Sequence, residues 1–249
     1  MDELEERLTK TERRMDYPNL RPKDAATLLV LDTDRDGDPR VLMGRRHERH
    51  RFMPGKFVFP GGRVDPGDCR AGVAADYDPV TYRQLLFDMK KKPTEARARG
   101  LAIAAIRETY EEAGLYIGRK QRSHLPGGAG LKPFVERAVA LDLAPLRFIG
   151  RAITPPRRPR RFDTRFFAVF ADAIADRTPE GVLPSGELEE IRWLSLDDAK
   201  SLDLPTITLV MIEELQRRLA ADRTLSRAQP VPYYYWARNR FNRTVIEPE

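Results

Sequence analysis

Arg107-Glu108-Thr109-Tyr110-Glu111-Glu112-Ala113-Gly114-Leu115 is the stretch of sequence that decides the fold. Its three glutamates stand at positions i, i+3 and i+4, so they share one face of a helix that Gly114 ends. Like charges on one face repel, and a plain surface helix gains nothing from them. A hard divalent cation such as Mg²⁺ prefers oxygen ligands and would convert this repulsion into binding. For the glutamates taken alone, a solvated acidic face is the simpler interpretation.

The sequence around this stretch predicts a long helix preceded by a glycine pair. Thr94 is a suitable N-cap, and the apolar residues between 101 and 106 need burial, so the helix is predicted over Glu95 to Ala113. Upstream, a short strand runs into Phe59-Pro60-Gly61-Gly62. Glycines permit close backbone approaches that other residues forbid.

Further elements alternate along the chain, which argues for an α/β or α+β fold rather than a helical bundle. The apolar runs predict strands near 25–31, 40–46, 146–152, 165–171 and 190–194, and helices near 80–89 and 204–221. The domain is predicted over residues 22–222. A charged segment, 1–21, precedes it, and a tail rich in aromatic residues and arginine, 223–249, follows it. Docking of the tail aromatics onto the body or a dimer partner is favoured over stacking on a base.

Composition bounds the classes of function. The 249 residues carry a formal net charge of +6, mostly from arginine, which suits phosphate and carboxylate ligands. With Cys69 as the one cysteine, neither an intrachain disulfide nor a cysteine-based zinc site is expected. No apolar run approaches the roughly 20 residues of a membrane span, so no membrane partner is expected. A cytoplasmic location is predicted.

Gly62-x5-Asp68 and, further on, Arg107-Glu108-x-x-Glu111-Glu112-x-Gly114-Leu115 resemble the two halves of the Nudix box of Nudix hydrolases. The second half matches at all its charged and glycine positions, with Thr109 where an aliphatic residue is usual. The first half departs from the pattern, because Asp68 stands where the family has glutamate. In addition, 38 residues separate Asp68 from Arg107 where the family has seven, so 31 are added.

The added segment, about 69–99, is similar to the long insertion of the peroxisomal-type coenzyme A diphosphatase branch of that family. Phe59 to Gly62 and the run from Arg161 to Phe167 resemble the same branch. The resemblance implies an α/β fold: a Nudix-type α/β/α sandwich with a mixed sheet and a helical insertion.

The resemblance also implies a set of site residues. Glu108, Glu111 and Glu112 would bind Mg²⁺ (or Mn²⁺), with Glu111 and Arg107 in the catalytic machinery. Arg107 would hold one of the carboxylates in position, or form a simple i,i+4 pair with Glu111. Gly61 and Gly62 would let their loop pass close to the metal-binding helix. Glu187, six residues before Trp193, is the candidate general base, with Glu189 and Glu190 as open alternatives.

Two groups of arginines are candidates for binding substrate phosphates. The first lies in a proline-stiffened loop and comprises Arg157, Arg158, Arg160 and Arg161. The second, Arg45 and Arg46, follows a predicted strand, where Nudix enzymes often bind substrate. A basic solvated surface is the alternative for both groups.

The expected function is therefore Mg²⁺-dependent hydrolysis of a diphosphate linkage in a small phosphorylated substrate, with coenzyme A or an acyl derivative preferred. Other nucleoside diphosphate derivatives remain open: ADP-ribose, a nucleotide sugar or a dinucleotide. A Nudix-like regulatory module that binds a ligand without catalysis is the rival from another class. A nucleic-acid partner is not expected, because no stacking sheet or basic helix supports one. A homodimer is left open.

Overall fold

The computed structural model describes residues 3–11, 16–49, 54–121, 129–179, 183–226 and 229–248. Its helices are α1 Glu3–Lys10, α2 Pro79–Leu86, α3 Glu95–Ala113, α4 Lys132–Glu136, α5 Leu196–Lys200 and α6 Thr206–Ala221, with short 3-10 turns at Asp68–Arg70, Ala129–Leu131 and Ala171–Ala173. Its strands are β1 Lys23–Thr33, β2 Pro39–Arg46, β3 Phe57–Val58, β4 Gly61–Arg63, β5 Leu115–Ile117, β6 Arg119–Lys120, β7 Val139–Ala140, β8 Arg147–Ile153, β9 Phe162–Phe170, β10 Ile174–Arg177, β11 Leu188–Ser195, β12 Val231–Ala237 and β13 Arg240–Ile246.

A mixed sheet forms the middle layer. Its strands follow the order β11-β2-β1-β9-β8-β12-β13, with β3 paired to β2 and β4 paired to β1. The β1–β9 and β8–β12 pairs are parallel, and the other pairs are antiparallel. Two further pairs, β5–β10 and β6–β7, lie outside this sheet.

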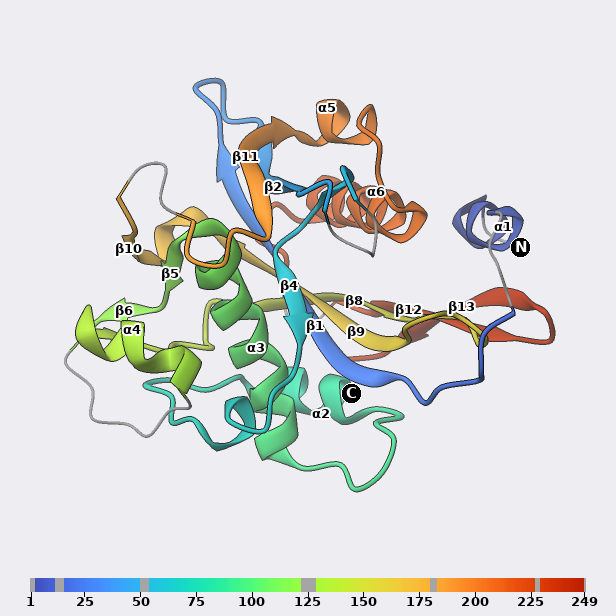
Figure 1. The fold of residues 1–249 in the computed structure, drawn as a ribbon, viewed down its shortest axis with the longest axis horizontal. Helices are drawn as coiled ribbons and strands as arrows, with labels where there is room; N and C mark the ends of the chain where they lie inside the picture. Colours follow the sequence, from blue (N-terminus) through green and yellow to red (C-terminus); the bar gives the residue numbers. More distant parts are fainter. Residues whose placement is uncertain are drawn as a thin grey trace.

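Helices cover both faces of the sheet (Figure 1), with α2 and α3 on one side and α5 and α6 on the other. Successive side chains of β1 pack into the cores on the two faces of the sheet in turn, because side chains alternate across a strand. Ala26, Leu28 and Val30 join the core beneath α3, whereas Leu29 and Leu31 join the core beneath α6. The α/β fold with a mixed sheet, predicted from the resemblance, is confirmed.

The metal-candidate helix α3 has the ends that its sequence predicts. Thr94 caps it, with the Arg97 amide donating to Thr94 Oγ1 over 3.3 Å. Gly114 follows at φ 69°, a left-handed conformation that favours glycine, and its amide donates to the Tyr110 carbonyl over 2.8 Å. The helix stops there, and Leu115 begins strand β5.

The segment inserted into the box packs as a lobe against the α3 side of the sheet. Its helix α2 is capped by Asp78, whose Oδ1 accepts from the Thr81 amide over 2.9 Å. The buried Tyr77 ring stacks on Phe167 of β9 with centroids 6.2 Å apart. The insertion therefore contributes to the core and also connects the two halves of the box.

The region predicted as a tail contains two strands that sequence analysis did not predict. Strand β12 pairs in parallel with β8, and β13 pairs with β12 at one end of the sheet. Tyr233 and Tyr234 are buried on opposite faces, one in each core. Docking of these aromatic residues onto the body, the favoured alternative, is confirmed.

Candidate active site

Arg107, near the C-terminal end of α3, is the centre of the candidate site. Its side chain is only 7% exposed, yet it is fully charged and needs partners. Nε and Nη2 donate to the two carboxylate oxygens of Asp68 over 3.0 and 3.1 Å. Nη1 donates to Glu108 over 2.7 Å and to Glu111 over 3.0 Å, and Nη2 also donates to the Arg63 carbonyl over 3.1 Å. These five contacts match the five N–H donors of a guanidinium.

Asp68 completes the split box in space. It is 2% exposed, lies in a short turn at the start of the insertion, and accepts the Asp65 amide over 2.8 Å. The aspartate side chain is shorter than the glutamate usual in the family, but it still reaches Arg107 because the long arginine side chain extends toward it. The two halves of the box therefore remain in contact although the insertion separates them in the sequence.

The glycine pair brings strand β4 against the carboxylates. A Cβ at Gly62 would lie 2.4 Å from the carboxyl carbon of Glu108, and one at Gly61 would lie 2.6 Å from the Ala26 carbonyl oxygen. The Gly61 amide donates to Glu112 over 2.9 Å. At Gly61 a side chain would collide with backbone atoms, whereas at Gly62 it would displace the Glu108 carboxylate, so the close approach expected of Gly61 and Gly62 is observed.

Burial and mutual repulsion make the glutamates hard to ionise. Burial raises the pKa of Glu108 to about 7, and the neighbouring charges of Glu111 and Glu187 oppose the lowering effect of Arg107. Burial likewise raises the pKa of Glu112 to about 8, with Glu108 and Glu187 adding to it. The pKa of Glu111 is also raised by burial. The cluster therefore holds more carboxyl groups than its protein cations can keep ionised, and a bound cation would favour their charged forms.

Of the three acidic residues that precede Trp193, Glu187 is the one that faces the carboxylate cluster. It acts on the pKa of both Glu108 and Glu112 and lies 3.5 Å from Arg46. Glu189 and Glu190 instead pair with Arg45, over 2.7 and 3.3 Å. The geometry therefore favours Glu187 among the open alternatives.

A cleft of about 1070 Å³ lies over these groups. Glu108, Glu111, Glu187, Gly61 and Gly62 line one part of it. Apolar side chains from β3 and the residue after it, from β9, and from the N-cap and first turn of α6 line another part, namely Val58, Phe59, Phe166, Pro205 and Ile207. A third part is basic, formed by Arg21, Lys23, Arg160 and Arg161.

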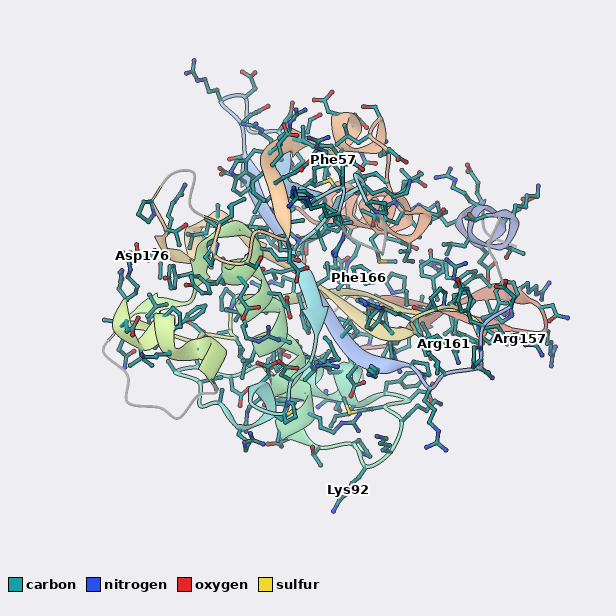
Figure 2. The ribbon with its side chains drawn as sticks, viewed as in Figure 1. Phe57, Lys92, Arg157, Arg161, Phe166 and Asp176 are labelled. Atoms are coloured by element: carbon teal, nitrogen blue, oxygen red, sulfur yellow. The ribbon has the colours of Figure 1, made fainter. Side chains whose placement is uncertain are left out.

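The structure divides the candidate arginines into two groups. Arg46, Arg160 and Arg161 line the cleft. Arg45 faces its acidic partners on β11, and neither Arg157 nor Arg158 lines the cleft. Arg157 lies beyond Arg161 toward the edge of the molecule (Figure 2). Lys23 also lines the cleft but was not predicted as a site residue, because a lysine at the start of a strand carries no local signal of a site.

The carboxylates supply the donor chemistry that Mg²⁺ or Mn²⁺ prefers, namely anionic oxygens clustered beside a cleft. In the described part of the chain, no three acidic, histidine or cysteine side chains are already arranged as a cage around one point. Glu108 and Glu111 turn toward Arg107 instead. The residues fit a divalent ion that replaces some of these contacts and takes its other ligands from water and phosphate oxygens, as Mg²⁺ commonly does.

Known proteins similar to this chain include Nudix hydrolases and acyl-coenzyme A diphosphatases. A Nudix hydrolase crystal structure from Alicyclobacillus acidocaldarius shares 30% identity, with a TM-score of 0.58 over 78% of this chain and 90% of that one. The acyl-coenzyme A diphosphatase NUDT19 of Homo sapiens is 29% identical over 208 residues, which are 64% of this chain and 54% of that protein. The Gallus gallus NUDT19 is 33% identical over 97 residues, which are 32% of this chain and 26% of that protein.

The fold, the split box and these similarities together define a member of the Nudix class of α/β/α proteins. The chain belongs to the Nudix hydrolase superfamily. It spans about half the length of the human relative and about a quarter of the chicken one. No protein-family model matches the chain.

Proposed function

We propose that this protein hydrolyses a diphosphate linkage in coenzyme A or an acyl-coenzyme A, with Mg²⁺ or Mn²⁺ as cofactor. The observation that carries the proposal is a cluster of carboxylates around Arg107 that outnumber the cations beside them. This cluster faces a cleft large enough for a nucleotide derivative. Glu108, Glu111 and Glu112 would hold the cation. When bound, such a cation neutralises diphosphate oxygens and acidifies water.

The protein's own residues would position the reacting groups. Arg107 is buried beneath the carboxylates, so its role is to hold Glu108 and Glu111 in place while Asp68 holds Arg107. Gly61 and Gly62 keep the cleft wall close enough for Glu112 to accept a backbone amide. The carboxylate of Glu187, at the cleft surface, would accept the proton of the attacking water.

The preference for coenzyme A rests on the similarity to the two NUDT19 proteins and on the lining of the cleft. An acidic part, a basic part and an apolar wall lie in one cleft, which suits a substrate with a diphosphate, further charge and an apolar chain. ADP-ribose, nucleotide sugars and dinucleotides share the diphosphate but lack the apolar chain. A cytoplasmic location remains a prediction from the cysteine usage, and the homodimer remains open.

The described chain has no helix with the length and apolar character needed to cross a bilayer.

A substrate panel tests this proposal. Purified protein with Mg²⁺ is incubated with coenzyme A, an acyl-coenzyme A, ADP-ribose and a dinucleoside polyphosphate, and the products are identified. We expect cleavage of coenzyme A and its acyl derivative to 3′,5′-ADP and a phosphopantetheine. Glu111→Gln should lower kcat/KM by roughly 10²- to 10³-fold, because it removes one anionic ligand beside the reacting diphosphate.

Glu136→Gln is the matched control. That glutamate is 60% exposed in α4, where it pairs with Lys132, so its change should leave the rate within about twofold. Hydrolysis that survives Glu111→Gln would contradict the assigned mechanism. Binding without hydrolysis of any compound in the unmodified protein would instead favour the non-catalytic regulatory module.

A further inference from the structure

The cleft is elongated along two paired strands. Three parallel cross-strand pairs line it in succession: Thr27 with Phe166, Ala25 with Thr164, and Lys23 with Phe162. Thr27 also pairs with Gly61, so this end adjoins the carboxylates. Lys23 lies four residues away, which corresponds to roughly 13 Å along a strand. The basic part is therefore a separate end of the cleft.

Arg161 is the best-anchored cation at this basic end. Its Nε donates to the Thr154 carbonyl over 3.1 Å, and Nη1 donates to Asn19 Oδ1 over 2.8 Å and to the Leu20 carbonyl over 2.6 Å. All three acceptors are neutral. Nη2 donates to none of the described residues, so part of the guanidinium fork remains available. The anchoring contacts fix the fork before any ligand arrives.

The basic end also has no balancing acid among the described residues. Burial alone lowers the pKa of Arg161, with no nearby carboxylate to offset it. Arg21, Lys23 and Arg160 line the same end, and the ion pairs of the described chain include none of their side chains. By contrast, the buried Arg107, Arg151 and Arg165 all face carboxylates. Unbalanced cations gathered at a cleft end favour an anion.

We propose that Arg161 and Lys23 form a second phosphate-binding subsite, which selects ligands carrying a phosphate monoester in addition to the phosphates held at the carboxylate end. This inference rests on the proposed function, because it assumes that the carboxylate end receives a nucleotide diphosphate. A guanidinium fork beside an ammonium suits the two charges and three free oxygens of a phosphate monoester. The ligand chemistry is that of a nucleoside bearing a ribose phosphate.

Two nucleotides isolate this subsite from the rest of the cleft. Adenosine 3′,5′-bisphosphate and adenosine 5′-monophosphate share the base, the ribose and the 5′-phosphate, so the ratio of their Kd values reports on the 3′-phosphate alone. We expect isothermal titration calorimetry with Mg²⁺ present to give about tenfold tighter binding of the bisphosphate, as one charge-assisted contact typically provides. The preference should weaken as salt is raised.

Lys23→Gln and Arg161→Gln should each reduce the preference to about threefold or less, since each removes one cation from the subsite. Lys23→Gln guards against misfolding, because the Lys23 side chain has no hydrogen bond or ion pair with any residue that the structure describes. Lys92→Gln removes the same charge at an exposed position, at the lower edge of the view in Figure 2 and away from Arg161, and should leave the preference unchanged. It controls for long-range attraction by net charge.

The outcomes separate this inference from the proposed function. The subsite would be overturned if the unmodified protein bound the two nucleotides with equal Kd values. It would also be overturned if neither nucleotide bound measurably. A preference that both cleft variants retain would overturn it as well. Because the assay follows binding and not cleavage, a preference that depends on Arg161 and Lys23 would support the subsite even if the substrate panel showed no hydrolysis.

Discussion

At the scale of single residues, the Arg107–Asp68 pair is the contact on which the site depends. Both side chains are buried, at 7% and 3% exposure, and they share two hydrogen bonds. Asp68→Asn removes the charge that faces the guanidinium but keeps the shape. We expect it to lower the free energy of unfolding by about 3–5 kcal/mol, the usual effect of breaking a buried pair. Urea unfolding followed by circular dichroism measures this loss.

Asp203→Asn supplies the comparison for an exposed pair. Asp203 is 76% exposed and lies 2.5 Å from Lys56, so solvent screens the interaction. The expected loss is under about 1 kcal/mol. Equal losses at positions 68 and 203 would mean that Asp68 does not hold Arg107 against the glutamates.

The Gly62→Ala variant tests whether the position of Glu108 matters for catalysis, without altering any charge. Gly62→Ala places a methyl group 2.4 Å from the Glu108 carboxyl carbon, so the glutamate must move. We expect kcat/KM for the cleaved substrate to fall about 10²-fold, which is a typical effect of displacing a catalytic group by an ångström. Steady-state kinetics measure the fall, and thermal unfolding should show only a modest change because Glu108 has the cleft to move into.

Gly37→Ala is the control for glycine replacement. Gly37 lies in the β1–β2 turn at φ 85°, with nothing within 4 Å of its added Cβ. Backbone strain should cost about 1 kcal/mol there, with no effect on kinetics. A similar loss of activity in both variants would remove the steric explanation for Gly62.

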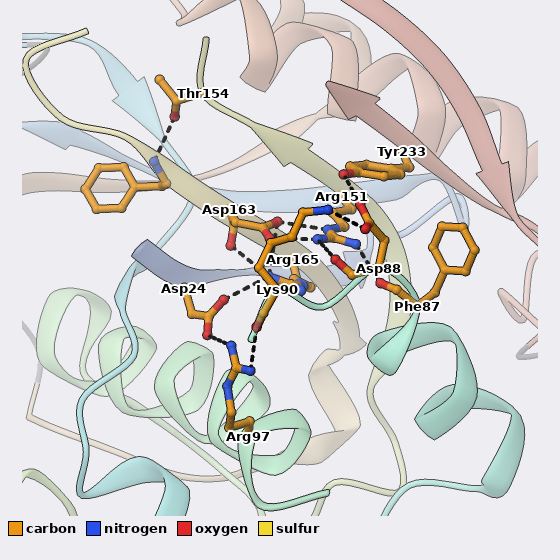
Figure 3. Close-up of polar contacts among 11 residues, drawn as sticks. Asp24, Phe87, Asp88, Lys90, Arg97, Arg151, Thr154, Asp163, Arg165 and Tyr233 are labelled. Atoms are coloured by element: carbon orange, nitrogen blue, oxygen red, sulfur yellow. Dashed lines mark hydrogen bonds and ion pairs between the residues drawn. The ribbon is translucent and has the colours of Figure 1, made fainter. Parts of the chain in front are cut away.

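At the scale of elements, a buried charge network holds the inserted lobe to the sheet (Figure 3). Arg151 of β8 donates to both oxygens of Asp163 over 2.8 and 2.7 Å. It also donates to the carbonyls of Phe87 and Asp88, which follow α2 in the insertion, over 2.7 and 3.1 Å. Its guanidinium stacks on Tyr233 of β12 at 4.4 Å from the ring centre. One side chain thus links the insertion to three strands.

Arg151→Met should therefore release the end of the insertion. It leaves the Asp163 carboxylate with Arg165 alone and deprives two carbonyls of their donor. We expect a loss of about 3–5 kcal/mol in unfolding free energy and faster amide hydrogen exchange over residues 87–92. Arg99→Met changes a pair with Asp76 whose side chains are 34% and 30% exposed, and should lose about 1 kcal/mol or less. Unchanged exchange over 87–92 in the Arg151 variant would contradict the link.

Elements with local signals were predictable, and contacts between distant segments were not. Thr94 and Gly114 mark the ends of α3, so its bounds, Glu95–Ala113, follow from the sequence. Strands β12 and β13 were not predicted because their tyrosines and arginines do not alternate simply between apolar and polar residues. They are stabilised instead by the pairing of β12 with β8, which is distant in the sequence. The same reason applies to the site: spacing groups the glutamates, but only the fold brings Lys23 and Arg161 to one cleft.

At the scale of the whole molecule, α1 covers the outer edge of the sheet. Strand β13 is last in the strand order, and an uncovered edge strand invites pairing with another chain. Two of its amides donate to α1 side chains instead: Phe241 to Thr9 Oγ1 over 3.1 Å, and Arg243 to Glu5. Leu4 and Leu8 pack into the core beside α6, at 0% and 3% exposure. The N-terminal helix thus shields the edge through both side-chain hydrogen bonds and apolar packing.

Replacing both leucines of α1 by aspartate should detach the helix and expose that edge. Two buried carboxylates cannot be solvated in place, so undocking of α1 is the least costly response. We expect the Phe241 and Arg243 amides to lose hydrogen-exchange protection, and analytical ultracentrifugation to show concentration-dependent self-association. A Glu6→Gln variant, altered on an exposed face that pairs with Lys10, should do neither. Full protection of both amides in the double variant would mean that β13 keeps its edge covered without α1.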